Sequence, residues 1–215
     1  PFVGKWRSLG VLIGCELLAM GVWFASAAVL PALRAEHTLS PTFEALLTSA
    51  VQIGFVAGTL ASATLSLPDR VDPRLLLRIS AIIAGLASFA SAALPGDSYV
   101  LIALRLLTGI CMAGVYPVGM KIASSWARND TGLLIGMLVG ALTVGSASPH
   151  LIAAIGGVDW RLTYLVAGAF AIAAGLGTGW VALGPGMGTA PPFDPRHALK
   201  AWNDRPLRLD GDDLT

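Results

Sequence analysis

The chain has 215 residues, of which 55% are hydrophobic and only 13% are charged, and its net charge is +1. A soluble domain carries about 25% charged residues. This composition, with a mean hydropathy of +0.72, therefore excludes a water-exposed globular surface and indicates the lipid bilayer as the surroundings. The basic residues are few and scattered, which excludes nucleic acid as a partner.

Six segments are long and apolar enough to cross a bilayer, which takes about 20 residues for each helix. In chain order they cover about residues 8–33, 43–67, 75–94, 99–122, 131–155 and 162–183. Polar residues that favour helix starts stand between them, namely Ser40-Pro41, Asp72-Pro73, Asp97-Ser98, Asn129-Asp130 and Asp159. The sequence therefore predicts an all-α membrane protein, with a six-helix transmembrane bundle over residues 1–183.

A polar segment follows the sixth apolar stretch. Gly184-Pro185-Gly186 ends the helical pattern, and residues 184–215 are predicted to form a cytoplasmic loop or tail with a short helix around 195–202. With the N-terminus inside, eleven of the 14 Lys and Arg residues lie on the cytoplasmic side, and only Arg34 and Arg161 lie outside. Basic residues favour the cytoplasmic side, so we expect both the N-terminus and the segment after the sixth helix to lie inside.

Arg105 is the clearest ionisable residue within an apolar segment, about 10 Å below the outer surface. Such residues usually face a protein interior or a water-filled cavity, although snorkelling or a structural bond to carbonyls remains open. Thr108, Gly109, Met112 and Tyr116 share its helical face. This stripe suits a cavity wall, and a close helix contact through Gly109 is the alternative.

Glu16 is the second such residue, about 12 Å from the inner surface, and Met20 and Trp23 share its face. Its depth differs from that of Arg105 by only about 8 Å. A direct or water-bridged couple with Arg105 and an independent structural role for Glu16 are both open. Gln52, on the second apolar segment, is a weaker cavity candidate.

The fifth apolar segment carries Gly136, Gly140 and Gly145, followed by Pro149. Small residues let helix backbones approach closely, and a proline bends a helix, so these four residues predict packing and a hinge. Histidines 37, 150 and 197 are scattered, and no nucleophile–base pair, metal spacing or phosphate-binding loop is present. The sequence therefore predicts neither an enzyme nor a bound cofactor or metal.

Several motifs, in this order, resemble the N-terminal six-helix half of a major facilitator superfamily transporter. Asp69-Arg70-Val71-Asp72-Pro73-Arg74 resembles a degenerate form of the signature loop between the second and third helices. Arg105-Leu-Leu-Thr-Gly109 resembles the helix-four arginine motif, and Gly136 to Pro149 resembles the helix-five glycine-proline motif. Finer features resemble bacterial nitrate/nitrite or cyanate-type permeases, namely Trp23-Phe24, Pro31, residues 49–55, Gly114-Val115-Tyr116-Pro117 and Asp159-Trp160-Arg161.

The resemblance implies half of a twelve-helix fold, with a 3+3 inverted repeat, in the bacterial plasma (inner) membrane. It implies secondary active transport of a small solute, with an anion as one option, by proton-coupled symport or antiport and alternating access. Asp69, Arg70 and Arg74 would stabilise the outward-open state, and Arg105 would serve proton coupling or anion binding. The signature loop lacks its usual glycine after Asp69-Arg70.

The resemblance also implies a second six-helix bundle, because the family's cavity lies between two halves. We expect this partner to be either a C-terminal half or a second copy of the chain. The alternative is a truncated or split-gene half-transporter without independent transport activity.

Overall fold

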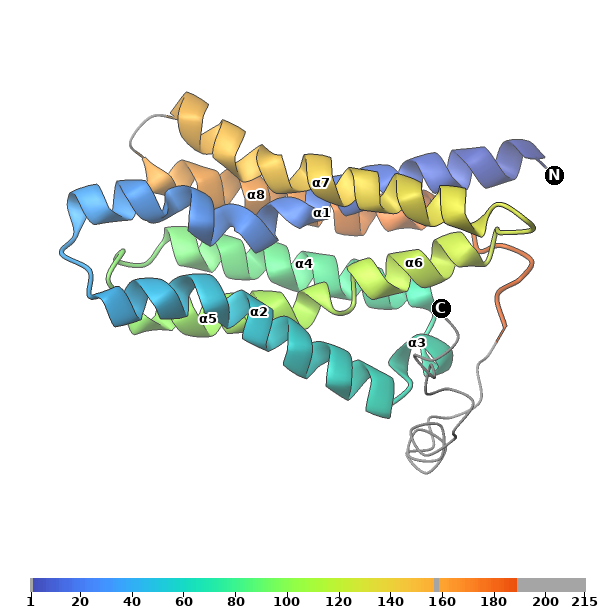
Figure 1. Cartoon of the computed structure of the whole chain (residues 1–215), viewed down its shortest axis with the longest axis horizontal. Coiled ribbons are helices and arrows are strands. Elements are labelled where there is room, and N and C mark those ends of the chain that lie inside the picture. The colour runs from blue at the N-terminus through green and yellow to red at the C-terminus, as the bar shows by residue number, and fades with distance from the viewer. Residues whose placement is uncertain (1, 157–158, 189–215) are drawn as a thin grey trace, which may run out of the picture.

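The computed structural model describes residues 2–156 and 159–188. Long helices lie side by side in one bundle (Figure 1). In chain order the helices are α1 (Phe2–Glu36), α2 (Pro41–Thr64), α3 (Leu67–Arg70), α4 (Pro73–Ala92), α5 (Tyr99–Met112), α6 (Tyr116–Ser124), α7 (Thr131–Gly156), α8 (Trp160–Gly177) and the 3-10 turn η1 (Thr178–Trp180). In the described part of the chain, six helical stretches are long and apolar enough to cross a membrane, which confirms the six predicted spans and the all-α fold.

The boundaries differ from the prediction at three places. The first helix reaches Glu36 and includes Pro31, and the sixth ends at Gly177 rather than near residue 183. The fourth span is broken into α5 and α6. The short helix predicted around residues 195–202 lies outside the described residues.

The two ends of the bundle carry different helix connections. We call the end where α1 begins the Lys5 end; it holds α3, the α6–α7 connection and residues 181–188 (Figure 1). The opposite end, called the Glu36 end, holds the connections α1–α2, α4–α5 and α7–α8. Antiparallel helices with short connections produce this arrangement.

Glycines set the closest helix contacts. α2 packs along α5, and α4 packs along α8. A Cβ on Gly109 would lie 2.8 Å from the backbone nitrogen of Phe55 in α2, and one on Gly168 would lie 2.8 Å from the Gly85 carbonyl oxygen in α4. These backbones approach too closely for any larger residue, as small-residue packing between membrane helices requires.

The predicted cap residues begin four of the helices. Ser40, Asp72, Ser98 and Asp159 each accept a hydrogen bond from a backbone N–H of the first turn that follows. Asp130 precedes α7, but its carboxylate accepts hydrogen bonds from the Lys5 ammonium at 2.6 Å and from the Arg128 N–H at 3.1 Å. The Lys5 bond lowers the pKa of Asp130 below its ordinary value and joins the start of α1 to the start of α7.

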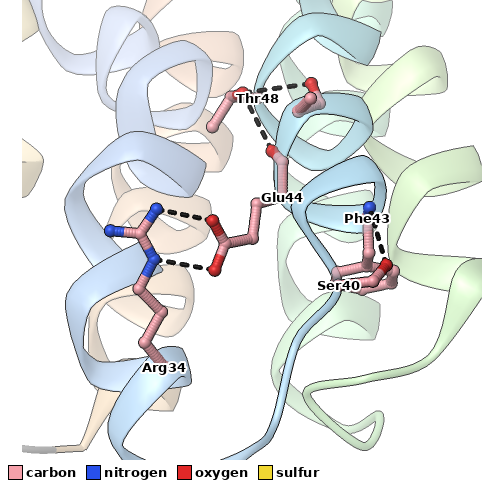
Figure 2. A network of polar contacts seen from close by, with 6 residues as sticks. Arg34, Ser40, Phe43, Glu44 and Thr48 are labelled. Carbon is pink, nitrogen blue, oxygen red and sulfur yellow. Dashed lines mark hydrogen bonds and ion pairs between the residues drawn. The ribbon is translucent and has the colours of Figure 1, made fainter.

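Figure 2 shows how polar contacts join α1 to α2 at the Glu36 end. The Arg34 guanidinium donates two hydrogen bonds to the Glu44 carboxylate, at 2.7 and 2.5 Å. Ser40 caps α2 through the Phe43 N–H, and the Thr48 hydroxyl donates to the Glu44 carbonyl one turn back. This bidentate ion pair fixes the α1–α2 connection. Apart from it, α1 and α2 make few contacts with each other.

Asp72 offers a test of the cap at the start of α4. Its carboxylate accepts from the Arg74 backbone N–H at 2.8 Å and pairs with the Arg74 guanidinium at 2.7 Å. Asp72→Ala should lower the free energy of unfolding by about 1 kcal/mol, whereas Asp72→Asn, which keeps the cap, should lower it by less. Unfolding in mixed micelles at neutral pH measures both variants. Equal losses would show that the cap contributes nothing.

The stabilisation by Asp72 should depend on pH, in the direction given by the lowered pKa of its carboxyl group. The Arg74 side chain, by its hydrogen bond, lowers the pKa of Asp72 below its ordinary value. The stabilisation is therefore complete above the ordinary carboxyl pKa and disappears as the pH falls through the lowered pKa. The difference between the wild type and Asp72→Asn should vanish over that acidic range.

Candidate functional site

Arg105 lies on α5, fully enclosed by the bundle. Its guanidinium donates to the Val22 carbonyl of α1 at 3.0 Å and to the hydroxyls of Ser91 and Ser88 of α4 at 3.2 and 3.5 Å. The guanidinium carbon lies 4.9 Å from the centre of the Tyr164 ring of α8, a cation–π contact. One side chain thus contacts three neighbouring helices.

The positive charge of Arg105 has no carboxylate partner among the described residues. Its Nε has no hydrogen-bond partner there either. Carbonyl and hydroxyl dipoles together with the ring of Tyr164, rather than an anionic side chain, therefore hold the guanidinium in the apolar interior. The site keeps a net positive charge.

Glu16 lies on α1 and is 1% exposed. Neither carboxyl oxygen has a hydrogen-bond partner in the described structure. The side chain lies against Gly119 of α6, where a Cβ would lie 2.9 Å from the Glu16 carboxyl carbon. An ionised carboxylate in such a place would be very unfavourable without partners, so this group is suited to bind a proton.

Glu16 and Arg105 form no direct pair. The Arg105 guanidinium binds Val22, which lies six residues beyond Glu16 on α1, or about 9 Å along the helix axis. Each group instead has its own surroundings, with Ser88, Ser91 and Tyr164 around Arg105 and Gly119 against Glu16. Glu16 and the Val22 carbonyl that binds Arg105 therefore lie at neighbouring levels of α1.

The predicted stripe along the fourth span is not one continuous helical face. α5 ends at Met112 and α6 begins at Tyr116, so the helical period breaks before the last member. Thr108 and Met112 are fully buried, and the Thr108 hydroxyl donates to the Leu104 carbonyl of its own helix. Gly109 packs on α2, which is the close-contact alternative.

The other predicted pathway residues lie nearer the surface of the bundle. Trp23 is half-buried and packs edge to face on Phe55 of α2, with the ring centres 4.9 Å apart. Tyr116 is half-buried, and Gln52 is exposed on α2. These three side chains are accessible from outside the bundle, whereas Arg105, Thr108 and Glu16 are enclosed.

The predicted gate loop lies at the Lys5 end. Asp69 forms an ion pair with Lys121 of α6, and the Lys121 ammonium also donates to the Pro68 carbonyl at 2.9 Å. Arg74 pairs with Asp72, and Arg70 is exposed. Residues 68–73 border a cavity of about 260 Å³ together with Lys121, Leu183, Met187 and Gly188.

The glycines of α7 divide into two groups. Gly145 packs against α1, where a Cβ would lie 2.7 Å from the Leu17 carbonyl oxygen. Gly136 and Gly140 are exposed, with no atoms of the described chain within 4 Å of a Cβ placed there. Pro149 is buried within the continuous helix α7.

Sequence reasoning missed several partners of the site. From the sequence, Lys121 only adds to the basic residues at the cytoplasmic end of the fourth span, whereas in the structure it pairs with Asp69 of the predicted gate loop. Ser88 and Ser91 are spaced one helical turn apart, which is the signal that a polar face of α4 meets Arg105. Gly119, three residues after Tyr116, gave no signal in the sequence.

Six apolar spans that enclose two ionisable side chains define an integral membrane protein of the multi-span helical class. The family model of the Major Facilitator Superfamily matches residues 12–207. The chain therefore belongs to the Major Facilitator Superfamily and is a transporter. Comparison with individually curated proteins gives no match.

Proposed function

We propose that this protein transports a small anionic solute together with protons, by alternating access. The observation that carries the proposal is Glu16, a buried carboxyl without a hydrogen-bond partner inside the membrane part of the bundle. Such a group can take up and release a proton while the protein changes conformation. Arg105 supports the anionic substrate class, because its buried positive charge has no carboxylate partner in the described bundle and attracts anions electrostatically.

The proposal includes a second six-helix bundle, supplied by a C-terminal half or a second copy of the chain. α2 and α7 support it because they are the least enclosed spans of the bundle. Exposed apolar side chains, among them Ile53, Val56 and Leu60, cover α2, and the open Gly136 and Gly140 lie on α7. Native mass measurement of the protein extracted from its membrane should show a particle well above the 22.2 kDa of these 215 residues, either as a longer chain or as a complex. A particle that contains a single six-helix bundle would contradict this part.

We further propose that the Lys5 end faces the cytoplasm of a bacterial cell, with the chain in the inner membrane. The bias of Lys and Arg residues toward this end supports the orientation. Nitrate, nitrite and cyanate are the first solutes to test, because of the resemblance of residues 49–55 and 114–117 to permeases for these ions. In the same proposal, Asp69, Arg70 and Arg74 stabilise the outward-open state from the cytoplasmic end.

Glu16→Gln tests the proton coupling. Gln keeps the size of the side chain but cannot exchange a proton, so a pH gradient should no longer drive net uptake into proteoliposomes. We expect at least a tenfold loss of gradient-driven uptake of nitrate, nitrite or cyanate, while exchange of labelled solute at equal pH continues. The neighbouring substitution Cys15→Ala is the matched control. Gradient-driven uptake that survives Glu16→Gln unchanged would remove Glu16 from the coupling.

A further inference from the structure

The fourth span is interrupted at its middle. The N–H groups of Gly114 and Val115 donate to the carbonyls of Cys111 and Met112, at 2.8 and 3.1 Å. These are three-residue bonds, which tighten the end of α5 and leave the regular four-residue ladder incomplete. α6 then begins anew at Tyr116, so residues 113–115 join two separate helices.

The new start gives α6 a free N-terminal turn inside the membrane. The first N–H groups of a helix have no partner within it, and Pro117, the second residue of α6, has no N–H at all. The aligned peptide dipoles give this turn a partial positive charge. The turn thus favours a negative charge placed beside it.

Glu16 is the side chain beside this turn. A Cβ on Gly119 would meet the Glu16 carboxyl group, so the α6 backbone and this side chain are in direct contact. The carboxyl oxygens nevertheless accept no hydrogen bond in the described structure. Without partners, an ionised carboxylate is far more unfavourable here than a protonated carboxyl, so ionisation favours a rearrangement that brings hydrogen-bond donors to Glu16.

No other charged group of the described residues competes for Glu16. The Cys15 thiol is its neighbour on α1, and Lys121 of α6 is held by Asp69 and Pro68. None of the remaining charged or titratable side chains on the packed helices forms a hydrogen bond or an ion pair with Glu16 in the described structure. They are Lys5, Arg7, Arg34 and Glu36 of α1, Glu44 of α2, Arg74 and Arg78 of α4, Tyr99, Arg105 and Cys111 of α5, Tyr116 of α6, His150 of α7, and Arg161 and Tyr164 of α8.

We propose that the N-terminal turn of α6 is the moving partner of Glu16, and that proton gain and loss at Glu16 shifts α6 about residues 113–115. This inference rests on the proposed function, because it takes Glu16 as the proton site. The ionised carboxylate accepts hydrogen bonds from the free N–H groups of the turn and draws α6 toward α1. The protonated carboxyl releases the turn.

The shift of α6 reaches the gate loop through Lys121. This residue lies two positions after Gly119, and its ammonium holds both the Pro68 carbonyl and the Asp69 carboxylate. When α6 moves, the Lys121 contacts move with it or break. The proton site within the membrane is thereby connected to the loop of residues 68–73 at the Lys5 end.

Pulsed electron resonance between two spin labels measures the shift. Labels at Ser124 of α6 and Leu176 of α8, both exposed, go into a variant in which Cys15 and Cys111 are replaced by Ala. We expect the distance to change by about 2 Å in one step with pH and to stay constant in Glu16→Gln. A reference pair at Leu46 of α2 and Val100 of α5 should stay constant in both proteins. A step that persists in Glu16→Gln would overturn the inference.

Gly119→Ala separates the inference from the proposed function. The added methyl group displaces the Glu16 carboxyl from the turn, so the distance step should be lost while the infrared carbonyl band of protonated Glu16 still titrates. Gly10→Ala, on an open face of α1, should retain both signals. If the distance between the labels at Ser124 and Leu176 stays fixed in the wild type while this band titrates, the inference is overturned but the proposed function is not. A band that is unchanged in Glu16→Gln would overturn the proposed function as well.

Discussion

Arg105→Ala is expected to abolish solute uptake while leaving the protein inserted in the membrane. Insertion depends on the length and hydropathy of the spans. Replacing Arg105 by Ala leaves the length of its span unchanged and raises its hydropathy, so the protein should still insert. In the proposed mechanism, transport depends on the positive charge of Arg105, which Ala lacks. The variant also leaves the Val22 carbonyl and the hydroxyls of Ser88 and Ser91 without their donor, so the free energy of unfolding should fall by roughly 3–5 kcal/mol.

Arg105→Lys separates charge from geometry. Lys keeps the positive charge, but a single ammonium cannot span the Val22 carbonyl and the two serines as the planar guanidinium does. Uptake should be partly retained and stability should be intermediate. The exposed Arg128→Ala is the control for general loss of a basic residue. Uptake in proteoliposomes and unfolding in mixed micelles measure both effects, and unchanged uptake by Arg105→Ala would remove Arg105 from the mechanism.

The number of spans and their caps could be predicted from the sequence, because both depend on local properties. Length and hydropathy decide whether a segment crosses a bilayer, and residues such as Ser40 and Asp72 satisfy the N–H groups of the turn that follows them. The same local reasoning placed Glu16 and Arg105 within apolar segments. Their burial in the structure agrees with the high energy of an exposed charge in lipid.

The partners of these residues could not be predicted, because they come from other helices. Helical periodicity gives the residues that share a face, but not the helix that the face meets. It therefore could not place Tyr164 under Arg105 or Gly119 against Glu16. The break at residues 113–115 could not be predicted either, since the apolar segment through Gly114 and Pro117 predicts one continuous helix.

Glycine positions show the same limit. The sequence drew attention to Gly136 and Gly140 because their spacing is regular, yet both are open in the described structure. The close contact between α2 and α5 uses Gly54 and Gly109 instead. Spacing identifies a smooth helix face, but only the packing decides whether that face meets a helix of the same chain.

Gly109→Ala is expected to be among the most destabilising single-methyl changes in the bundle. A Cβ there would meet the Val51 carbonyl and lie 2.8 Å from the Phe55 nitrogen, and neither backbone atom can rotate away as a side chain could. α2 and α5 must therefore separate, which should lower the free energy of unfolding by about 3 kcal/mol. Gly136→Ala on α7, with open space around it, should change stability by less than about 1 kcal/mol. Equal effects of the two variants in mixed-micelle unfolding would contradict the α2–α5 contact.

A second glycine of the same contact makes the prediction sharper. Gly54 lies on α2 and faces α5, where a Cβ would lie 3.1 Å from the Ile110 nitrogen. Once one methyl group has pushed the two helices apart, the second has more room. The double variant Gly54→Ala with Gly109→Ala should therefore be less destabilised than the sum of the single variants, by about 1 kcal/mol or more. Gly109→Ala combined with Gly168→Ala, which acts between α4 and α8, should be additive, since the two contacts lie between different helix pairs.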